Sequence, residues 1–496
     1  MNKMLKQFDR HHLILGAVFF LIFILRFPSL FEPFWYGDEG IFAAVARNLN
    51  LGGVLYQTAW DNKPPMIYLT YAGIFSIFGV SMFWLRFVAC VAVLATAGAI
   101  YEIARMNLGK KRALLATLIF GFLTSLRLLE GNLALTEIFM ILPISLAFLH
   151  VVYRKFDTSS LFVAGILFGV ASLFKQVGAF EAAALGIYLF LSNKSLIGFV
   201  KKGFVLSVGF AACYAVTIIY FSSKGLLWDY YFAAYAYYRI YLGESPKYAV
   251  LVNIAKYLPV LAVVGYGIFK KYKKSGVGMF HMFLLWVAFS FLGSYFSGRT
   301  YGHYLVQATP GVALLVASLN FSKIKFERTR VIFAIAFVVP ILYLTSFLFS
   351  DFLTGGSINQ IKYWQNFVSY ASGKKSIDAY NNYFDVDVNT IMALSDLLRL
   401  NDGYGKSVYI WGDYPWLYAI DDARNPSRYV TSFHVFGVPG GAEEVAKALN
   451  IKPPEFIIKP QRSIGYFEEL EKLLLTKYTL LAKINTAEVF ILKSAN

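Results

Sequence analysis

Residues 13–40 read LILGAVFFLIFILRFPSLFEPFWYGDEG. The segment 13–31 is an apolar run of about the length that an α-helix needs to cross a bilayer. An aromatic and acidic turn, Trp35 to Gly40, follows it closely. No small-residue cleavage site follows the run, so we expect it to remain as a membrane anchor rather than to act as a cleaved signal. The stretch therefore predicts a membrane helix that ends beside ionisable side chains.

The composition extends this prediction to most of the chain. Of 496 residues, 58% are hydrophobic and only 15% are charged. A soluble domain usually has about 45–50% apolar and about 25% charged residues, so the charge deficit argues against a soluble protein. The chain has 15 prolines and no low-complexity tract, which argues against disordered and fibrous classes. A polytopic α-helical membrane protein remains.

The net charge of +17 does not indicate nucleic-acid binding, because the basic residues gather in short segments between apolar runs. Basic residues in short loops are typical of the cytoplasmic side of a membrane protein. These segments lie at 3–10, 105–112, 154–155, 194–202, 270–274 and 323–330. The chain should therefore expose alternate loops to the cytoplasm.

The basic loops also fix the number of crossings. Spans are predicted near 13–31, 84–104, 113–128, 134–153, 160–175, 177–192, 203–221, 249–269, 279–297, 304–320 and 331–350. The apolar run 65–80 is short and follows two prolines. If it crossed, the N-terminus and the 105–112 loop would lie on opposite sides. We therefore interpret 65–80 as an interfacial helix, which gives 11 spans, a cytoplasmic N-terminus and an external first loop, 32–83.

The composition changes after residue 350, where polar residues, Asn, Asp and Gly become frequent. Helical patterns alternate with strand-like runs, which is typical of a small α/β domain. Helices are expected near 389–400, 441–449 and 465–475, and strands near 407–411, 455–459, 478–484 and 487–493. The predicted organisation is a transmembrane domain, 1–350, followed by an extracytoplasmic α/β domain, 351–496.

Ionisable residues outside the basic loops gather at one membrane face. They are Asp38, Glu39, Asp61, Lys63, Arg86, Glu130, Glu137, Lys175, Glu181, Arg239, Lys256, Arg299 and His303. On the predicted topology nearly all of them lie at the outer ends of spans or in outer loops. A transporter would more often place such groups along a path through the midplane. This distribution favours a reaction centre at the outer face.

Several of these residues also have a plain structural interpretation. Asp38 opens a helix-like stretch, 40–50, where an acidic residue can stabilise a helix N-terminus. Asp61 can belong to a turn that leads into the 65–80 helix. Glu137 and Lys175 stand at span ends, where capped or snorkelling side chains are common. His303 can be an incidental loop histidine.

Taken together and in this order, the motifs resemble a known family. It is the C-type superfold of polyprenyl-phosphate-dependent glycosyltransferases, which includes bacterial relatives of protein O-mannosyltransferases and the lipid A aminoarabinose transferase. The resemblance covers roughly residues 10–350. The motifs are Asp38-Glu39, Lys63-Pro64, Phe78-Gly79 with Arg86, Gly109–Ala113, Leu135–Glu137, Phe174–Gln176, Arg239, and Gly298-Arg299 through Tyr304.

The resemblance implies a role for each motif residue. Asp38 matches the catalytic base, Glu39 its secondary neighbour, and Glu137 a second acidic position. The basic positions that would face the donor phosphate are Lys63, Arg86, Lys175, Arg239 and Arg299. Asp61, Tyr301 and His303 are expected to contact substrate. Some relatives hold a metal with a Glu before the Lys-Pro and a His in the loop that corresponds to 222–248. Here Asn62 precedes Lys63 and that loop has no His, so no metal or other cofactor is predicted, although Asp38, Glu137 and His303 leave a divalent metal open.

The implied activity is transfer of a sugar from a polyprenyl-phosphate donor to a hydroxyl acceptor at the outer face of a bacterial-type cell membrane. The expected partners are this donor, membrane lipids and a protein, glycan or glycolipid acceptor of the cell envelope, with no nucleic acid. A single base opposite the leaving phosphate implies inversion at the anomeric carbon. The alternatives are a transporter or lipid-linked-sugar flippase without transferase chemistry, and a non-catalytic receptor. Inverted repeats would support the transporter, and a receptor would not explain the acidic pair with its surrounding basic residues.

Overall fold

The fold is known from a computed structural model that describes residues 10–193, 195–243, 265, 276–297, 299, 301–319, 359–460 and 465–493. Two predicted spans, 249–269 and 331–350, lie outside the described residues apart from Gly265. The chain divides into two compact units. Unit 1 comprises Met1–Ser29, Arg86–Thr217 and Ser245–Trp364, and unit 2 comprises Leu30–Leu85, Ile218–Glu244 and Gln365–Asn496.

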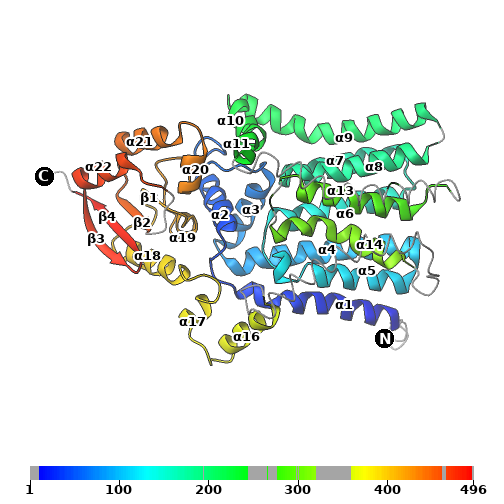
Figure 1. Cartoon of the computed structure of the whole chain (residues 1–496), viewed down its shortest axis with the longest axis horizontal. Coiled ribbons are helices and arrows are strands. Elements are labelled where there is room, and N and C mark those ends of the chain that lie inside the picture. Colours follow the sequence, from blue (N-terminus) through cyan, green and yellow to red (C-terminus); the bar gives the residue numbers. More distant parts are fainter. Residues whose placement is uncertain are drawn as a thin grey trace. The chain divides into compact units, whose positions relative to one another are not determined.

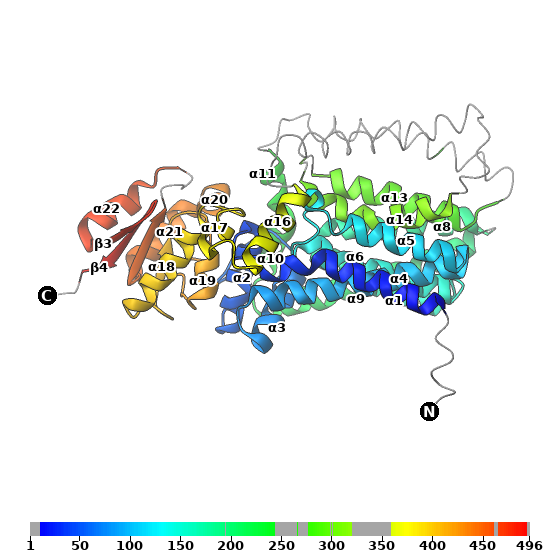
Figure 2. The same ribbon diagram turned by 90° about the horizontal axis from the view of Figure 1, so that it is seen from below.

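Apolar helices build unit 1. They are α1 (Arg10–Arg26), α4 (Met82–Leu108), α5 (Lys110–Leu123), α6 (Thr136–Tyr153), α7 (Thr158–Phe174), α8 (Ala179–Ser192), α9 (Leu196–Ser223), α13 (Met279–Tyr295) and α14 (Thr309–Ser318). Short helical turns join them: η2 (Phe27–Phe31), η3 (Arg127–Leu129), η4 (Gln176–Gly178) and η6 (Gly302–Ala308). Helix α6 packs on α7, α8 on α13, and α5 on α1 and α14. Helices α1, α4, α5 and α14 run nearly parallel in two perpendicular views (Figures 1 and 2).

Several of these helices are long and apolar enough to cross a membrane. Among the described residues, Arg10–Phe31, α4, α6 and α9 meet both conditions of length and composition. The shorter apolar helices are Met66–Phe78, Thr158–Phe174, Gln176–Ser192 and Met279–Tyr295. The backbones of α7 and α9 approach each other closely at Gly165. A Cβ added to Gly165 would lie only 2.2 Å from the Leu206 carbonyl oxygen. Such contacts between small residues are a common way to pack membrane helices.

The predicted span 304–320 is not one continuous α-helix. Residues Gly302–Ala308 form the 3-10 helix η6, and α14 begins at Thr309 with Pro310 in its first turn. Proline lacks an amide hydrogen, so the first turn of an α-helix is the place where it fits best. The chain therefore starts a new helix at Thr309 instead of extending the preceding one.

A mixed sheet forms the centre of the C-terminal part of unit 2. Its strands β1 (Val408–Ile410), β2 (Phe456–Pro460), β3 (Tyr478–Ile484) and β4 (Ala487–Leu492) lie in the order β1-β2-β4-β3. Strand β1 pairs parallel to β2, and β4 pairs antiparallel to β2 and β3. Helices α18 (Val388–Leu400), α21 (Gly441–Ile451) and α22 (Glu468–Lys477) accompany it, with α21 and α22 on one side and α18 on the other (Figure 1). All four strands and three helices expected in this region are confirmed.

The short helices of unit 2 were not predicted, apart from two. Helix α2 (Gly37–Asn50) confirms the helix-like stretch 40–50, and α3 (Met66–Phe78) occupies the apolar run 65–80. The others are α10 (Leu227–Tyr231), η5 (Phe232–Ala236), α11 (Tyr238–Gly243), α16 (Gln360–Ala371, which begins in unit 1), α17 (Ile377–Asn381), α19 (Trp416–Ile420) and α20 (Ser432–Gly437). Apart from α16, these helices have five or six residues, which give too few positions for an apolar period to be recognised. Helix α16 has 12 residues and was missed despite its length.

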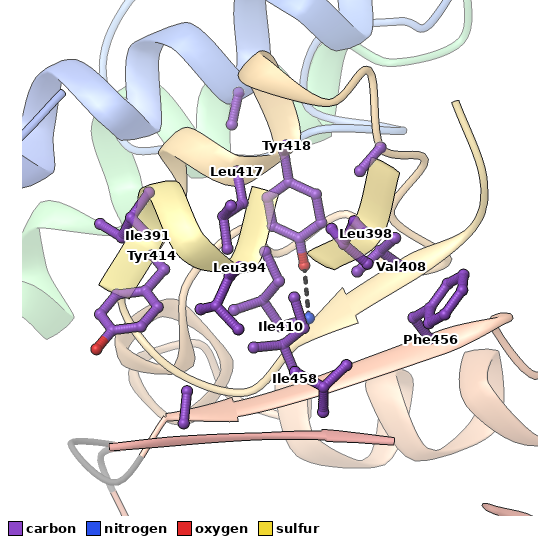
Figure 3. Packing of buried hydrophobic residues seen from close by; sticks show 14 of the residues in the cluster. Ile391, Leu394, Leu398, Val408, Ile410, Tyr414, Leu417, Tyr418, Phe456 and Ile458 are labelled. Atoms are coloured by element: carbon purple, nitrogen blue, oxygen red, sulfur yellow. Dashed lines mark hydrogen bonds between the residues drawn. The ribbon is translucent and has the colours of Figure 1, made fainter. Parts of the chain in front are cut away.

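The core of unit 2 joins the segment 32–83 to the C-terminal sheet. Ala44 of α2 belongs to the same buried cluster as residues of α18, α19 and the strands. Figure 3 shows Leu394 and Leu398 of α18 and Leu417 and Tyr418 of α19 packed over Ile410 and Ile458. The Ile410 amide donates a hydrogen bond of 2.9 Å to the Tyr418 hydroxyl inside this cluster. Residues from both ends of the sequence thus share one core.

Helix α3 is expected to stay on the outer side of the membrane. It has 13 residues, which is about 20 Å of helix against a hydrocarbon core of about 30 Å. We predict that cysteines introduced at Gln57 and Ser81, in a chain whose Cys90 and Cys213 are replaced by alanine, both react with an impermeant maleimide from outside. Labelling of the Ser81 site from the cytoplasmic side alone would contradict the 11-span topology.

Candidate active site

Asp38 is the second residue of α2 and is half-buried, whereas Glu39 beside it is fully buried. The residue that caps this helix is Tyr36, and it makes no side-chain capping hydrogen bond. Asp38 thus lies within the first turn, where its charge is favourable, but it does not occupy the capping position. Its electrostatic neighbours include Lys63 and His434.

The N-terminal turn of α2 is held against α19. The Trp416 indole Nε1 donates a hydrogen bond of 3.1 Å to the Tyr36 carbonyl oxygen. A Cβ added to Gly40 would lie 2.8 Å from Trp416 Cδ1 and 2.9 Å from Pro415 Cγ. Glycine at position 40 is therefore needed for this close approach. The approach fixes the backbone that carries Asp38.

We predict that Gly40→Ala lowers the melting temperature in detergent, because the new methyl group must displace Trp416 or Pro415. Overpacking of this kind costs about 1–3 kcal/mol. Gly37→Ala is the matched control, since a Cβ at Gly37 in the same helix would meet nothing within 4 Å. Thermal unfolding of both variants measures the difference. Equal melting temperatures would show that the contact is not close in the folded protein.

The loop that carries Asp61 and Lys63 is ordered by two tyrosines. The Tyr68 hydroxyl donates a hydrogen bond of 2.7 Å to Asp61 Oδ2, and the Lys63 amide donates one of 3.1 Å to the same hydroxyl oxygen. The Tyr56 hydroxyl donates a hydrogen bond of 2.7 Å to the Lys63 carbonyl oxygen. The Lys63 ammonium donates one of 2.7 Å to Asn62 Oδ1. These bonds hold Asp61 buried and Lys63 half-buried at one place.

A histidine from the C-terminal region completes this group. His434 of α20 is 3% exposed, and its Nε2 lies 3.4 Å from Asp61 Oδ1. Burial lowers the pKa of His434, and nearby Lys63 lowers it further, whereas Asp61 and Asp38 oppose this without reversing it. The imidazole is therefore mainly neutral at pH 7. His434 could not be recognised from the sequence, since it stands 373 residues after Asp61 in a segment without a recognisable motif.

Lys63 keeps its charge in this group. Burial alone would lower the pKa of the Lys63 ammonium. Tyr238, Asp61, Asp38 and Tyr241 raise it by more, so the pKa lies well above its ordinary value. The structure thus brings together three of the predicted site residues in unit 2, Asp38, Asp61 and Lys63, as two carboxylates beside one permanent cation.

A second group of predicted residues lies in unit 1, around Glu137 and Lys175. Glu137 is the second residue of α6 and Lys175 directly follows α7, and both are buried. The Lys175 ammonium forms an ion pair with Glu137 Oε1, and the Thr136 hydroxyl donates a hydrogen bond of 2.8 Å to Glu137 Oε2. The ammonium also lies 3.6 Å from the centre of the Tyr304 ring. Lys175 is thus a buried, paired cation rather than a snorkelling one.

His303 belongs to the same unit and has an acidic partner. Its Nδ1 lies 2.5 Å from Glu130 Oε2, and its backbone amide donates a hydrogen bond of 3.3 Å to the same oxygen. Tyr301 stacks on the His303 ring at 5.6 Å between centroids, and Glu137 lies within electrostatic reach of His303. Glu130 adopts φ of 49°, a left-handed conformation uncommon for residues other than glycine. Glu130 is one of the ionisable residues noted in the sequence, but it was not predicted as a site residue.

The other three predicted basic residues have different surroundings. Arg86 is fully buried and donates a hydrogen bond of 2.7 Å to the Asn132 carbonyl oxygen in unit 1. Arg239 is exposed on α11, and Arg299 is half-buried next to Ser297, whose hydroxyl oxygen accepts a 3.3 Å hydrogen bond from the Arg299 amide. The Arg86 side chain is thus buried and bonded to the backbone of unit 1, whereas the exposed Arg239 side chain is accessible to a ligand.

No group of three His, Cys, Asp or Glu side chains among the described residues is arranged to hold a metal ion. Asp61 and His434 form one pair, and Glu130 and His303 another. The arrangement offers carboxylates as proton acceptors and ammonium or guanidinium groups as anion ligands. These are the groups that acid–base chemistry on a negatively charged substrate requires.

Comparison with known proteins gives matches to both sequence and structure. Residues 62–221 match a family described as dolichyl-phosphate-mannose-protein mannosyltransferase. The chain is 24% identical over 328 residues to an "uncharacterized protein" of Aquifex aeolicus (strain VF5), in an alignment that covers 61% of this chain. That alignment spans 63% of the Aquifex protein, less than two thirds of its length.

Two crystal structures of ArnT from Cupriavidus metallidurans are similar to almost the whole chain, covering 96% of it and 97% of ArnT. The structure bound to undecaprenyl phosphate has a TM-score of 0.55 at 14% identity, and the apo structure 0.56 at 13%. The comparisons confirm the resemblance and the helical polytopic fold class predicted from the sequence. The predicted enzyme class agrees with the description of the family that matches residues 62–221. The number of spans and the boundaries of the C-terminal domain stay predictions.

Proposed function

We propose that this chain is a membrane glycosyltransferase that moves a sugar from a polyprenyl-phosphate donor to a hydroxyl acceptor at the outer face of the cell membrane. The observation that carries the proposal is the group in unit 2, where Asp38 and Asp61 lie within electrostatic reach of a permanently charged Lys63. The fold supports the donor, because ArnT of the same fold has been crystallised with undecaprenyl phosphate.

Asp38 is the general base in this proposal. An acceptor hydroxyl is a weak nucleophile, and a carboxylate that takes its proton accelerates transfer by about 10²–10⁴-fold. The hydroxyl oxygen forms the new bond to the anomeric carbon while the bond from that carbon to the phosphate oxygen breaks. Direct attack opposite the leaving phosphate inverts the configuration. Asp38 is half-buried rather than sealed in the core, which leaves its carboxylate open to a ligand.

Basic residues stabilise the leaving group. Negative charge develops on the polyprenyl phosphate as the sugar leaves, and fixed cations in a site with little water stabilise it strongly. Lys63, Lys175, Arg239 and Arg299 are the candidates. Glu137 holds Lys175 in one position, so a phosphate that binds Lys175 shares the ammonium with that carboxylate. Asp61, Tyr301 and His303 would contact the sugar or the acceptor.

The experiment that tests the function is incubation of purified protein with a panel of polyprenyl-phosphate sugars and a cell-envelope extract as the acceptor source. The proposal expects release of free polyprenyl phosphate from at least one donor, and the Asp38→Asn variant should lack this release. Movement of the intact lipid-linked sugar across a vesicle membrane without its cleavage would instead identify a flippase.

Donor affinity provides a separate prediction. Replacing Lys175, Arg239 or Arg299 with Gln should weaken binding of the donor in at least one case, because a phosphate ligand is lost. Arg299→Lys keeps the charge but removes the bidentate hydrogen bonding of the guanidinium. It should therefore bind the donor more tightly than Arg299→Gln but more weakly than wild type. Lys472→Gln on the exposed face of α22 is the control. Unchanged donor affinity in all three Gln variants would refute the assignment.

A further inference from the structure

We propose that His434 is a positioning residue of the transfer reaction, supplied by the C-terminal region, which holds the Asp61 carboxylate in one orientation. This inference rests on the function proposed above. It assigns a role in the reaction to the C-terminal part of the chain, for which the sequence predicts only an external domain. The contacts that support this role lie within unit 2.

The segment that carries His434 is joined to the loop that carries Asp61. The Trp60 amide donates a hydrogen bond of 2.8 Å to the Arg428 carbonyl oxygen, and Trp60 and Tyr429 form a parallel β-bridge. Arg428 Nη1 donates a hydrogen bond of 3.1 Å to the Tyr56 carbonyl oxygen. Backbone and side-chain hydrogen bonds from the C-terminal region of the chain therefore hold the residues that directly precede Asp61.

The His434 ring itself is held in place. Its backbone amide donates a hydrogen bond of 3.4 Å to the Thr431 hydroxyl, which caps α20. Its ring meets the Trp60 ring edge to face, with centroids 5.0 Å apart at 77°. At 3% exposure the imidazole has little freedom to rotate. Nε2 thus stays directed at Asp61 Oδ1, 3.4 Å away.

Two neighbours then define the plane of the Asp61 carboxylate. The Tyr68 hydroxyl contacts Oδ2, and His434 Nε2 faces Oδ1. A neutral imidazole carries its hydrogen on one ring nitrogen, and the carboxylate favours that hydrogen on Nε2. Loss of the imidazole would allow the Asp61 carboxylate to rotate out of this orientation. A carboxylate displaced by about 1 Å can cost about a hundredfold in rate, because geometry near reacting groups is tightly limited.

Substitutions at His434 separate this role from that of an ordinary core histidine. A glutamine amide can reach the position of Nε2, whereas an asparagine amide reaches only that of Nδ1. We expect His434→Gln to retain kcat/KM within about threefold of wild type, and His434→Asn and His434→Leu to lose about 10- to 100-fold. His281→Gln, at another buried histidine in α13, is the control. Equal losses for Gln and Asn would overturn the proposal.

A double-mutant cycle with Asp61→Asn tests whether His434 acts through Asp61. In the Asp61→Asn background, His434→Leu should cost less than about threefold in kcat/KM, because the carboxylate that it positions is already gone. A merely structural histidine would give additive losses, which would overturn the proposal. The same cycle read as melting temperature needs no activity. If wild type cleaves no donor, the proposed function fails, while additive melting shifts would separately refute the His434–Asp61 contact.

Discussion

Asp38→Asn should fold normally and lose about a hundredfold or more of its turnover under saturating donor and acceptor. The amide is nearly isosteric with the carboxylate and can still accept a hydrogen bond, so contacts made by the oxygen survive. It cannot take a proton, so a general base is lost. Helix capping does not account for Asp38, because the capping position of α2 belongs to Tyr36.

The measurement is the rate of polyprenyl phosphate release together with a melting curve for each variant. Asp378→Asn is the matched control, because Asp378 is an exposed acidic residue in the first turn of α17 in the same unit. It should change neither quantity. Turnover close to wild type in Asp38→Asn would show that Asp38 is not the general base, even if the proposed donor is correct.

The second large effect concerns the buried ion pair in unit 1. Lys175→Met removes the cation from Glu137, whose side chain is 2% exposed, and leaves a buried carboxylate without its partner. Breaking a buried pair in this way costs about 3–5 kcal/mol, whereas replacing both charges by neutral groups is often close to neutral. We therefore expect Lys175→Met to be much less stable than the double variant Lys175→Met, Glu137→Gln.

The double variant also separates stability from donor binding. If Lys175 contacts the donor phosphate, the double variant should regain its melting temperature but still bind donor weakly. Thermal unfolding and donor binding in the same detergent measure the two effects. If the stability losses of Lys175→Met and Glu137→Gln, each measured alone, add up to that of the double variant, the ion pair does not form. Full recovery of donor affinity would exclude Lys175 as a phosphate ligand.

Local pattern was sufficient to predict much of the fold. The apolar runs gave α1, α4 and α6 close to their observed bounds, and the alternating pattern gave β1 to β4. These elements depend on periodicity within a few residues. The division of 302–318 into η6 and α14 was missed, since an apolar run does not show where the backbone changes from one helix type to another.

The candidate site was predicted only where a motif or a membrane boundary marked it. Asp38, Asp61 and Lys63 stand in short motifs of the first loop, and the structure brings them together. The partners of Asp61 and His303 were not recognised, because His434 is distant in sequence and Glu130 depends on an unusual backbone conformation. Pairing between distant residues follows from tertiary packing, which composition and period do not encode.

The stereochemistry of transfer tests the central claim most directly. A donor of known anomeric configuration is converted by the purified protein, and the configuration of the new glycosidic bond is determined by NMR. Direct displacement with Asp38 as the single base predicts an inverted product from wild type and no product bond above background from Asp38→Asn. A product that retains the donor configuration would require a second displacement and would contradict the mechanism.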